Sequence, residues 1–167
     1  MAWPANVDED GAAAAHQERP KSFLGRLVAW LGVWHPAAVH FPIALLLTVA
    51  FLEAAAALRR KPHYNAGNDV LLGLATLSAC IAAPLGWVSA GLPKADEEWF
   101  LTAHRWLGTA LPFLILLLWR LRARPGEPSA KTRLPFYKAA LIVAVLAVLA
   151  QAYLGAAVTH GLDHLGF

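Results

Sequence analysis

The sequence predicts an all-α integral membrane protein: an up-down four-helix bundle preceded by a short interfacial amphipathic helix. Two observations lead to this fold class. Hydrophobic residues make up 58% of the 167-residue chain, whereas soluble domains average about 45–50%. These residues are also grouped in blocks long enough, at about 1.5 Å per helical residue, to cross a hydrocarbon core about 30 Å thick.

Four apolar blocks are expected to span the membrane. They cover residues 36–58, 69–91, 101–119 and 137–160. Pro36 suits the first turn of a helix, because backbone N–H groups in that turn make no hydrogen bond within the helix. Tryptophans near the ends of the third block are typical of the membrane interface. We therefore assign residues 35–167 to one four-transmembrane-helix domain.

Two segments precede this domain. Residues 1–20 are acidic and rich in alanine, which indicates a mobile polar tail. Residues 21–34 place apolar side chains at near-helical spacing with Lys21 and Arg26 off that face, which favours a helix lying at the interface. The alternative, that this segment extends the first span, remains open.

Charge predicts the orientation in the membrane. Nine of the fourteen lysines and arginines lie in the loop after the first span and around the connection between the third and fourth spans. Because basic loops stay in the cytoplasm, both termini and the acidic loop 92–100 are expected in the periplasm of a bacterial inner membrane. No basic stripe of the kind that binds nucleic acid is visible.

Histidine is the residue type that points to a function. Of seven histidines, five are expected on the outer side of the bilayer, at the start of the first and third spans and at the end of the fourth; they are His35, His40, His104, His160 and His164. Several neutral imidazoles at one depth suit a metal ion or haem iron. The alternative is that each bonds to a backbone carbonyl, water or a lipid headgroup.

Depth suggests a pairing of these histidines. In an up-down bundle the first and third spans are diagonal, so His40 and His104 could clamp one haem b from both sides. The shallower His35 and His160 could hold a second haem or a haem propionate, and Arg105 is placed to pair with a propionate or a lipid phosphate. Small residues at compatible depths leave room; they are Gly86, Gly108, Gly155, Ala156 and Ala157.

Two further polar features lie in the spans. His160 and His164 are four residues apart, a spacing that puts both on one helix face, as in metal-binding helices. Glu53 is a lone acid near the inner end of the first span. We expect it to reach the interface or a neighbouring helix, with a proton-relay role as the less favoured alternative.

Three segments resemble a known family. HPAAVHFPIALLLTVAFLE (35–53) resembles the signature of a bacterial membrane family catalogued as domain of unknown function 2231. AHRWLGTA (103–110) and GAAVTHGLDHL (155–165) resemble a subgroup found fused to, or encoded beside, cytochrome c domains. This resemblance implies a four-helix module of respiratory electron transfer with His35, His40, His104 and His160 as candidate haem ligands. The chain lacks a haem c motif, and the subgroup's fourth-helix glycine pair reads Ala156-Ala157 here.

The first functional hypothesis is therefore a b-type cytochrome subunit with one haem b, or two, near the outer face. It would pass electrons between quinol and a separate cytochrome c or periplasmic dehydrogenase subunit, as part of a multi-subunit complex. A cofactor-free anchor or assembly subunit of a redox complex, and a metal-ion binding membrane protein, are the alternatives. No nucleophile, phosphate loop or carboxylate pair points to a stand-alone enzyme.

Overall fold

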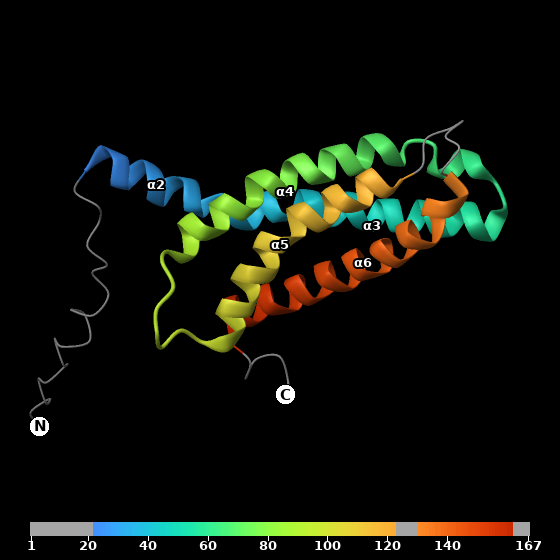
Figure 1. Ribbon diagram of the computed structural model, residues 1–167. Helices are drawn as coiled ribbons and strands as arrows, with labels where there is room; N and C mark the ends of the chain where they lie inside the picture. Colours follow the sequence, from blue (N-terminus) through green and yellow to red (C-terminus); the bar gives the residue numbers. More distant parts are fainter. Residues whose placement is uncertain (1–21, 123–129, 162–167) are drawn as a thin grey trace, which may run out of the picture.

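The protein is a bundle of long helices, shown as a ribbon in Figure 1. The computed structural model describes residues 22–122 and 130–161. Its elements in chain order are α2 (Phe23–Val33), α3 (His35–Arg59), the 3-10 helix η1 (Pro62–Asn65), α4 (Asn68–Ala90), α5 (Trp99–Leu121) and α6 (Ala130–His160). The predicted tail 1–20 and His164 lie outside the described residues.

The four long helices follow an up-down order. α3 packs on α4, α4 on α5 and α5 on α6, while α3 and α6 touch over a shorter stretch. α3 and α5 are consequently diagonal partners. Figure 1 shows that α5 begins and α6 ends at the same end of the bundle, below the last turns of α4. Side chains from the starts of α3 and α5 and the end of α6 can therefore meet there.

The apolar core lies along the middle of the bundle. Its fully buried side chains come from all four long helices and include Leu46, Leu72, Ile115 and Val148. Large apolar side chains also point outward; Phe113, for example, is 69% exposed. Apolar residues on both the inner and the outer face are what a helix surrounded by lipid requires.

The predicted fold class is confirmed. Within the described residues, four helices are long and apolar enough to cross a membrane. The first three predicted spans agree with α3, α4 and α5 within two residues at each end. α6 instead begins at Ala130, seven residues before the predicted span. Its first turns carry Lys131 and Arg133, so they do not belong to the apolar block. At about 1.5 Å per residue α6 is about 46 Å long and extends beyond a core about 30 Å thick.

Helix α2 precedes the bundle. Ser22 caps it by accepting a hydrogen bond from the Gly25 N–H at 3.1 Å, and only Trp34 separates it from α3. Gly32 packs against the backbone of α4, where an added Cβ would lie 3.1 Å from the Cα of Ser89. Most other side chains of α2 are exposed, and many of them are apolar. Its position at the membrane interface stays a prediction.

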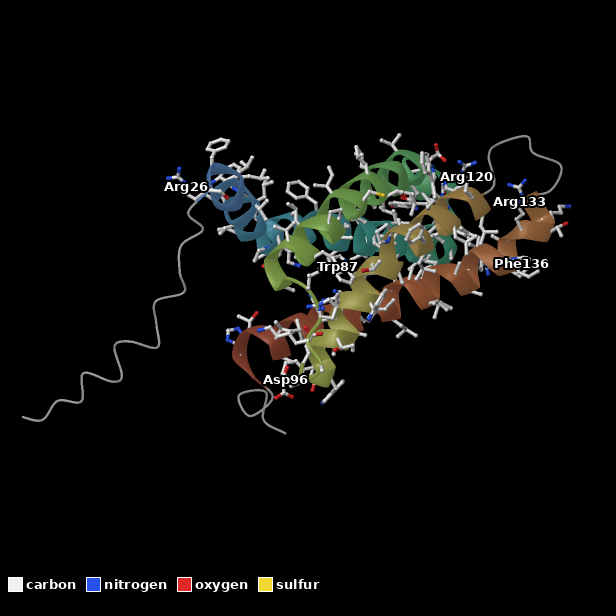
Figure 2. The ribbon with its side chains drawn as sticks, turned by 60° about the vertical axis from the view of Figure 1, so that its left-hand side comes forward. Arg26, Trp87, Asp96, Arg120, Arg133 and Phe136 are labelled. Carbon is white, nitrogen blue, oxygen red and sulfur yellow. The ribbon has the colours of Figure 1, made fainter. Side chains whose placement is uncertain are left out.

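A polar cluster closes the end of the bundle that carries the basic residues. Glu53 accepts hydrogen bonds from Asn65, Asn68, Tyr137 and Arg122 at 2.6–2.9 Å. Glu53 therefore reaches neighbouring helices, as expected, and its charge is balanced by the Arg122 guanidinium. Figure 2 shows Arg120 and Arg133 at this same end, far from Asp96 and Arg26.

Candidate functional site

Two of the predicted histidines meet at the opposite end of the bundle. His35 begins α3 and His104 lies in the second turn of α5. Their ring centres are 6.3 Å apart and the ring planes are nearly perpendicular, at 86°. Two imidazoles that bind one metal ion through nitrogen at about 2 Å place their ring centres about 6 Å apart. The two side chains thus have the separation of a bis-histidine ligand pair.

Each of these rings rests on a glycine of a neighbouring helix. A Cβ at Gly86 of α4 would lie 2.8 Å from Cε1 of His35, and one at Gly155 of α6 would lie 3.2 Å from Cε1 of His104. A Cβ at Gly108 of α5 would likewise lie 2.8 Å from Nε2 of Gln151, so this glycine makes room for the amide. The predicted small residues therefore do make room at this depth, and much of that room is taken by the polar side chains themselves.

Hydrogen bonds fix the tautomer of both rings. Nδ1 of His35 lies 3.0 Å from the carbonyl of Ala82, which can only accept, so Nδ1 carries the proton. The Gln151 amide nitrogen donates to the His104 carbonyl at 3.0 Å and lies 3.3 Å from Nε2 of His104. Nε2 of His104 therefore accepts. The Nε2 lone pair of His35 is free, the form that binds metal when Nδ1 donates elsewhere. The Nε2 lone pair of His104 is taken by the Gln151 amide, so binding a metal there would require that amide to be displaced.

Arg105 lies beside this pair and is almost fully buried. Its Nη2 donates to Glu97 at 2.8 Å in an ion pair whose side chains are 2% and 8% exposed. Its guanidinium also lies 5.0 Å from the centre of the Trp87 ring. Trp87 is held in turn by a 2.8 Å hydrogen bond from its indole N–H to Thr109. Figure 2 shows Trp87 between α4 and α5, at the end of the bundle that carries Asp96.

Two cavities adjoin the histidines. The outer one has a volume of about 230 Å³ and is lined by His35, His104, Arg105 and Gln151 together with residues of α4. The inner one, about 50 Å³, shares His35 and Gln151 and is otherwise apolar. An outer space with a few polar side chains on its wall, beside an apolar inner one, suits an amphipathic ligand.

Several buried polar atoms at the outer cavity have no partner within residues 22–122 and 130–161. They are Nδ1 of His104, Nε and Nη1 of Arg105, and Oε1 of Gln151. Leaving such atoms unpaired is costly, at about 1–3 kcal/mol for each group. Their concentration at one cavity indicates a place where a ligand or ordered water completes the hydrogen bonds.

The other predicted ligands lie elsewhere. His40 is exposed on α3, bonds through Nδ1 to the carbonyl of Pro36 one turn earlier, and does not line either cavity. His160 is the exposed last residue of α6. The structure therefore brings His35, His104 and Arg105 together, and it does not place His40 beside His104 or His160 beside His35. The His160–His164 pair cannot be assessed, because His164 lies outside the described residues.

Three contributors were not identified from the sequence. Gln151 belongs to no motif in the fourth span, although its spacing of four from Gly155 places both on one helix face. The bond of Glu97 depends on how the α4–α5 loop folds, and that of Trp87 depends on how α4 packs on α5. No local pattern indicates either. Within the described part of the chain, no group of three or more histidine, cysteine or acidic residues could hold a metal ion. A ligand pair for haem iron is smaller than such a group.

Comparison with known proteins agrees with this architecture. The model of the family described as "Predicted membrane protein (DUF2231)" matches residues 33–163, which include all four long helices. No curated protein and no solved structure matches the chain. Because the family model covers most of the sequence, the protein belongs to this family of membrane proteins.

Proposed function

We propose that this DUF2231 protein is a membrane-embedded b-type cytochrome subunit whose haem iron is bound by His35 and His104. The observation that carries the proposal is the 6.3 Å separation of the two rings, which come from diagonal helices. His35 presents a free Nε2 lone pair, and His104 would present one once iron replaced the Gln151 amide. This pair replaces the pair of His40 and His104 favoured by depth alone. Haem would supply one-electron redox chemistry at this position.

The surrounding residues fit a haem in their chemistry. Bis-imidazole ligation needs two neutral rings, each oriented by a bond from its other nitrogen or by packing. His35 has its bond to Ala82, and His104 is packed on Gly155. The free N–H groups of Arg105 would pair with a propionate carboxylate. The outer cavity, at about 230 Å³, is below the range of about 300–1,000 Å³ for ligand pockets, so a haem would enter only if the helices at this end moved apart.

The charge pattern supports a histidine pair near the periplasmic face. With the basic end in the cytoplasm of a bacterial inner membrane, the histidine pair lies near the periplasmic face and both termini are periplasmic. The loop between α4 and α5 carries the exposed carboxylates of Asp96 and Glu98 beside the site, while Glu97 is paired with Arg105. Such an acidic rim suits a basic periplasmic partner such as a cytochrome c, with quinol in the bilayer as the other redox partner.

A reduced-minus-oxidised visible spectrum and a pyridine haemochrome assay test the proposal. The protein is produced with excess haem and purified in mild detergent as wild type, His35→Ala, His104→Ala and His40→Ala. His40→Ala is the matched control, because His40 lies in the same helix and is exposed. A b-type spectrum that is lost in the first two variants and kept in the third supports the proposal; size-exclusion profiles show that each variant is folded.

One observation favours a second candidate, a cofactor-free anchor of a redox complex. Both histidine rings already fill glycine clearances and make internal hydrogen bonds, so helix packing alone accounts for them. Colourless wild-type protein from haem-sufficient cells, purified with its partner subunits, would favour the anchor. A spectrum lost in His40→Ala but kept in His35→Ala would instead restore the pairing of His40 with His104.

A further inference from the structure

A third, larger hollow lies at the basic end of the bundle, between α3 and α6. This α3–α6 groove has a volume of about 630 Å³ and is lined by residues of α3, η1 and α6. Its walls are alanines of α3, including Ala50, Ala54 and Ala57, and larger apolar side chains of α6, including Ile142 and Leu146. In a membrane such a groove faces the acyl chains, so it holds lipid or a lipid-like molecule rather than water.

The polar groups of the α3–α6 groove differ in how many hydrogen bonds and ion pairs they already make. Glu53 and Tyr137 line its inner part, but the carboxylate of Glu53 already accepts four hydrogen bonds, one of them from the Tyr137 hydroxyl. Arg60 and Lys138 are exposed, and in the described part of the chain neither makes an ion pair. The groove therefore offers two free cations and no free acid.

The spacing of these features matches one leaflet of a bilayer. Lys138 and Leu146 lie eight residues apart on α6, so the groove runs about 12 Å inward from its cations. One leaflet of the hydrocarbon core is about 15 Å deep. A molecule with an anionic head at the surface and an apolar chain along the groove would contact both the cations and the alanine wall.

We propose that the α3–α6 groove binds an anionic phospholipid of the cytoplasmic leaflet, with Arg60 and Lys138 on its phosphate and an acyl chain against Ala50, Ala54 and Ala57. Two cations from two different helices at the membrane surface are the pattern expected for headgroup binding. Arg60 ends α3 in the left-handed conformation, with φ of 53°, a position that glycine usually fills. An arginine is thereby held at the mouth of the groove. This inference is independent of the haem proposal.

Native mass spectrometry tests the lipid site. The full chain is released from mixed micelles that contain equal amounts of phosphatidylglycerol and phosphatidylcholine, which have matched acyl chains. We expect wild type to retain phosphatidylglycerol several-fold over phosphatidylcholine. Arg60→Gln/Lys138→Gln should lose this preference. The matched control, Arg59→Gln/Lys61→Gln, removes the same amount of charge at the two neighbours of Arg60, which do not line the groove, and should keep the preference.

A second pair of variants tests the apolar wall. Ala54→Phe fills the groove and should lower phospholipid retention, whereas Leu58→Phe, one turn further along α3 and 86% exposed, should not. Equal retention of both lipids by wild type, or equal loss in both charge variants, would overturn the proposal. Displacement of phosphatidylglycerol by an equal concentration of decylubiquinone would also overturn it and make the groove a quinone site.

Discussion

Replacing Gly86 by alanine should weaken the binding of the proposed cofactor while leaving the stability of the bundle nearly unchanged. The new Cβ would lie 2.8 Å from Cε1 of His35, and ordinary contact begins near 3.4 Å, so the ring must move by about 0.6 Å. A shift of that size along the 3.0 Å bond from Nδ1 to the Ala82 carbonyl would stretch it to about 3.6 Å, and a sideways shift would bend it; either weakens or breaks the bond.

The expected effects on stability nearly cancel. Loss of that hydrogen bond costs about 0.5–1.5 kcal/mol, and alanine in a helix interior gains about 0.5–1 kcal/mol over glycine. Cofactor affinity has no such compensation, because removing a bond that orients a metal-binding histidine typically lowers affinity by about 10- to 100-fold. Gly86→Ala should therefore unfold like wild type and bind haem at least about tenfold more weakly.

The assay is titration of the apoprotein with haemin in detergent, followed at the Soret band, with thermal unfolding measured in parallel. Gly73→Ala is the matched control, since Gly73 lies in the same helix but faces Trp119 at the other end of the bundle. Wild-type haem affinity in Gly86→Ala would refute the role given to His35.

Three further predictions concern other parts of the molecule. Glu53→Ala removes the acceptor of four hydrogen bonds and leaves the Arg122 guanidinium without its counter-ion. We expect the free energy of unfolding, measured in mixed micelles, to fall by about 3 kcal/mol. The haem content per folded protein should not change. Arg105→Gln removes a buried cation, which stabilises the reduced haem more than the oxidised one. For a charge interaction of about 1–2 kcal/mol, the midpoint potential should fall by tens of millivolts in a spectroelectrochemical titration. An unchanged or higher potential would contradict this. In a Cys80→Ala background, Asp96→Cys should react with an impermeant maleimide added to spheroplasts, whereas Lys61→Cys should react only after lysis; the reverse pattern would invert the proposed topology.

The depth of each functional residue could be predicted from the sequence, but its rotation could not. Apolar blocks give the four spans, and the order of spans puts His35, His40 and His104 on one side of the bilayer. His35 and His40 are five residues apart, about 500° around the helix, so only one of them can face the interior. In a soluble helix the apolar face would identify it. Here the lipid-facing surface is apolar too, and that signal disappears.

The contacts around the site were unpredictable for a related reason. Gln151 of α6 reaches His104 of α5, and which helix faces meet depends on close packing at Gly86, Gly108 and Gly155. Arg105 pairs with Glu97 of the loop before α5, so this contact depends on how that loop folds back on the helix. Glu53 was an easier case. A carboxylate within an apolar span must find donors, and the basic end of the bundle supplies Arg122 and Tyr137.

Electron paramagnetic resonance of the oxidised protein tests the central claim, that His35 and His104 bind one haem iron, most directly. Two histidine ligands make ferric haem low-spin, and nearly perpendicular rings, as seen at 86°, make that signal strongly anisotropic. We predict such a low-spin signal in wild type and in His40→Ala, and conversion to a high-spin signal or loss of haem in His35→Ala and His104→Ala. A wild-type protein without a low-spin haem signal, or one whose signal survives both substitutions, would contradict the claim.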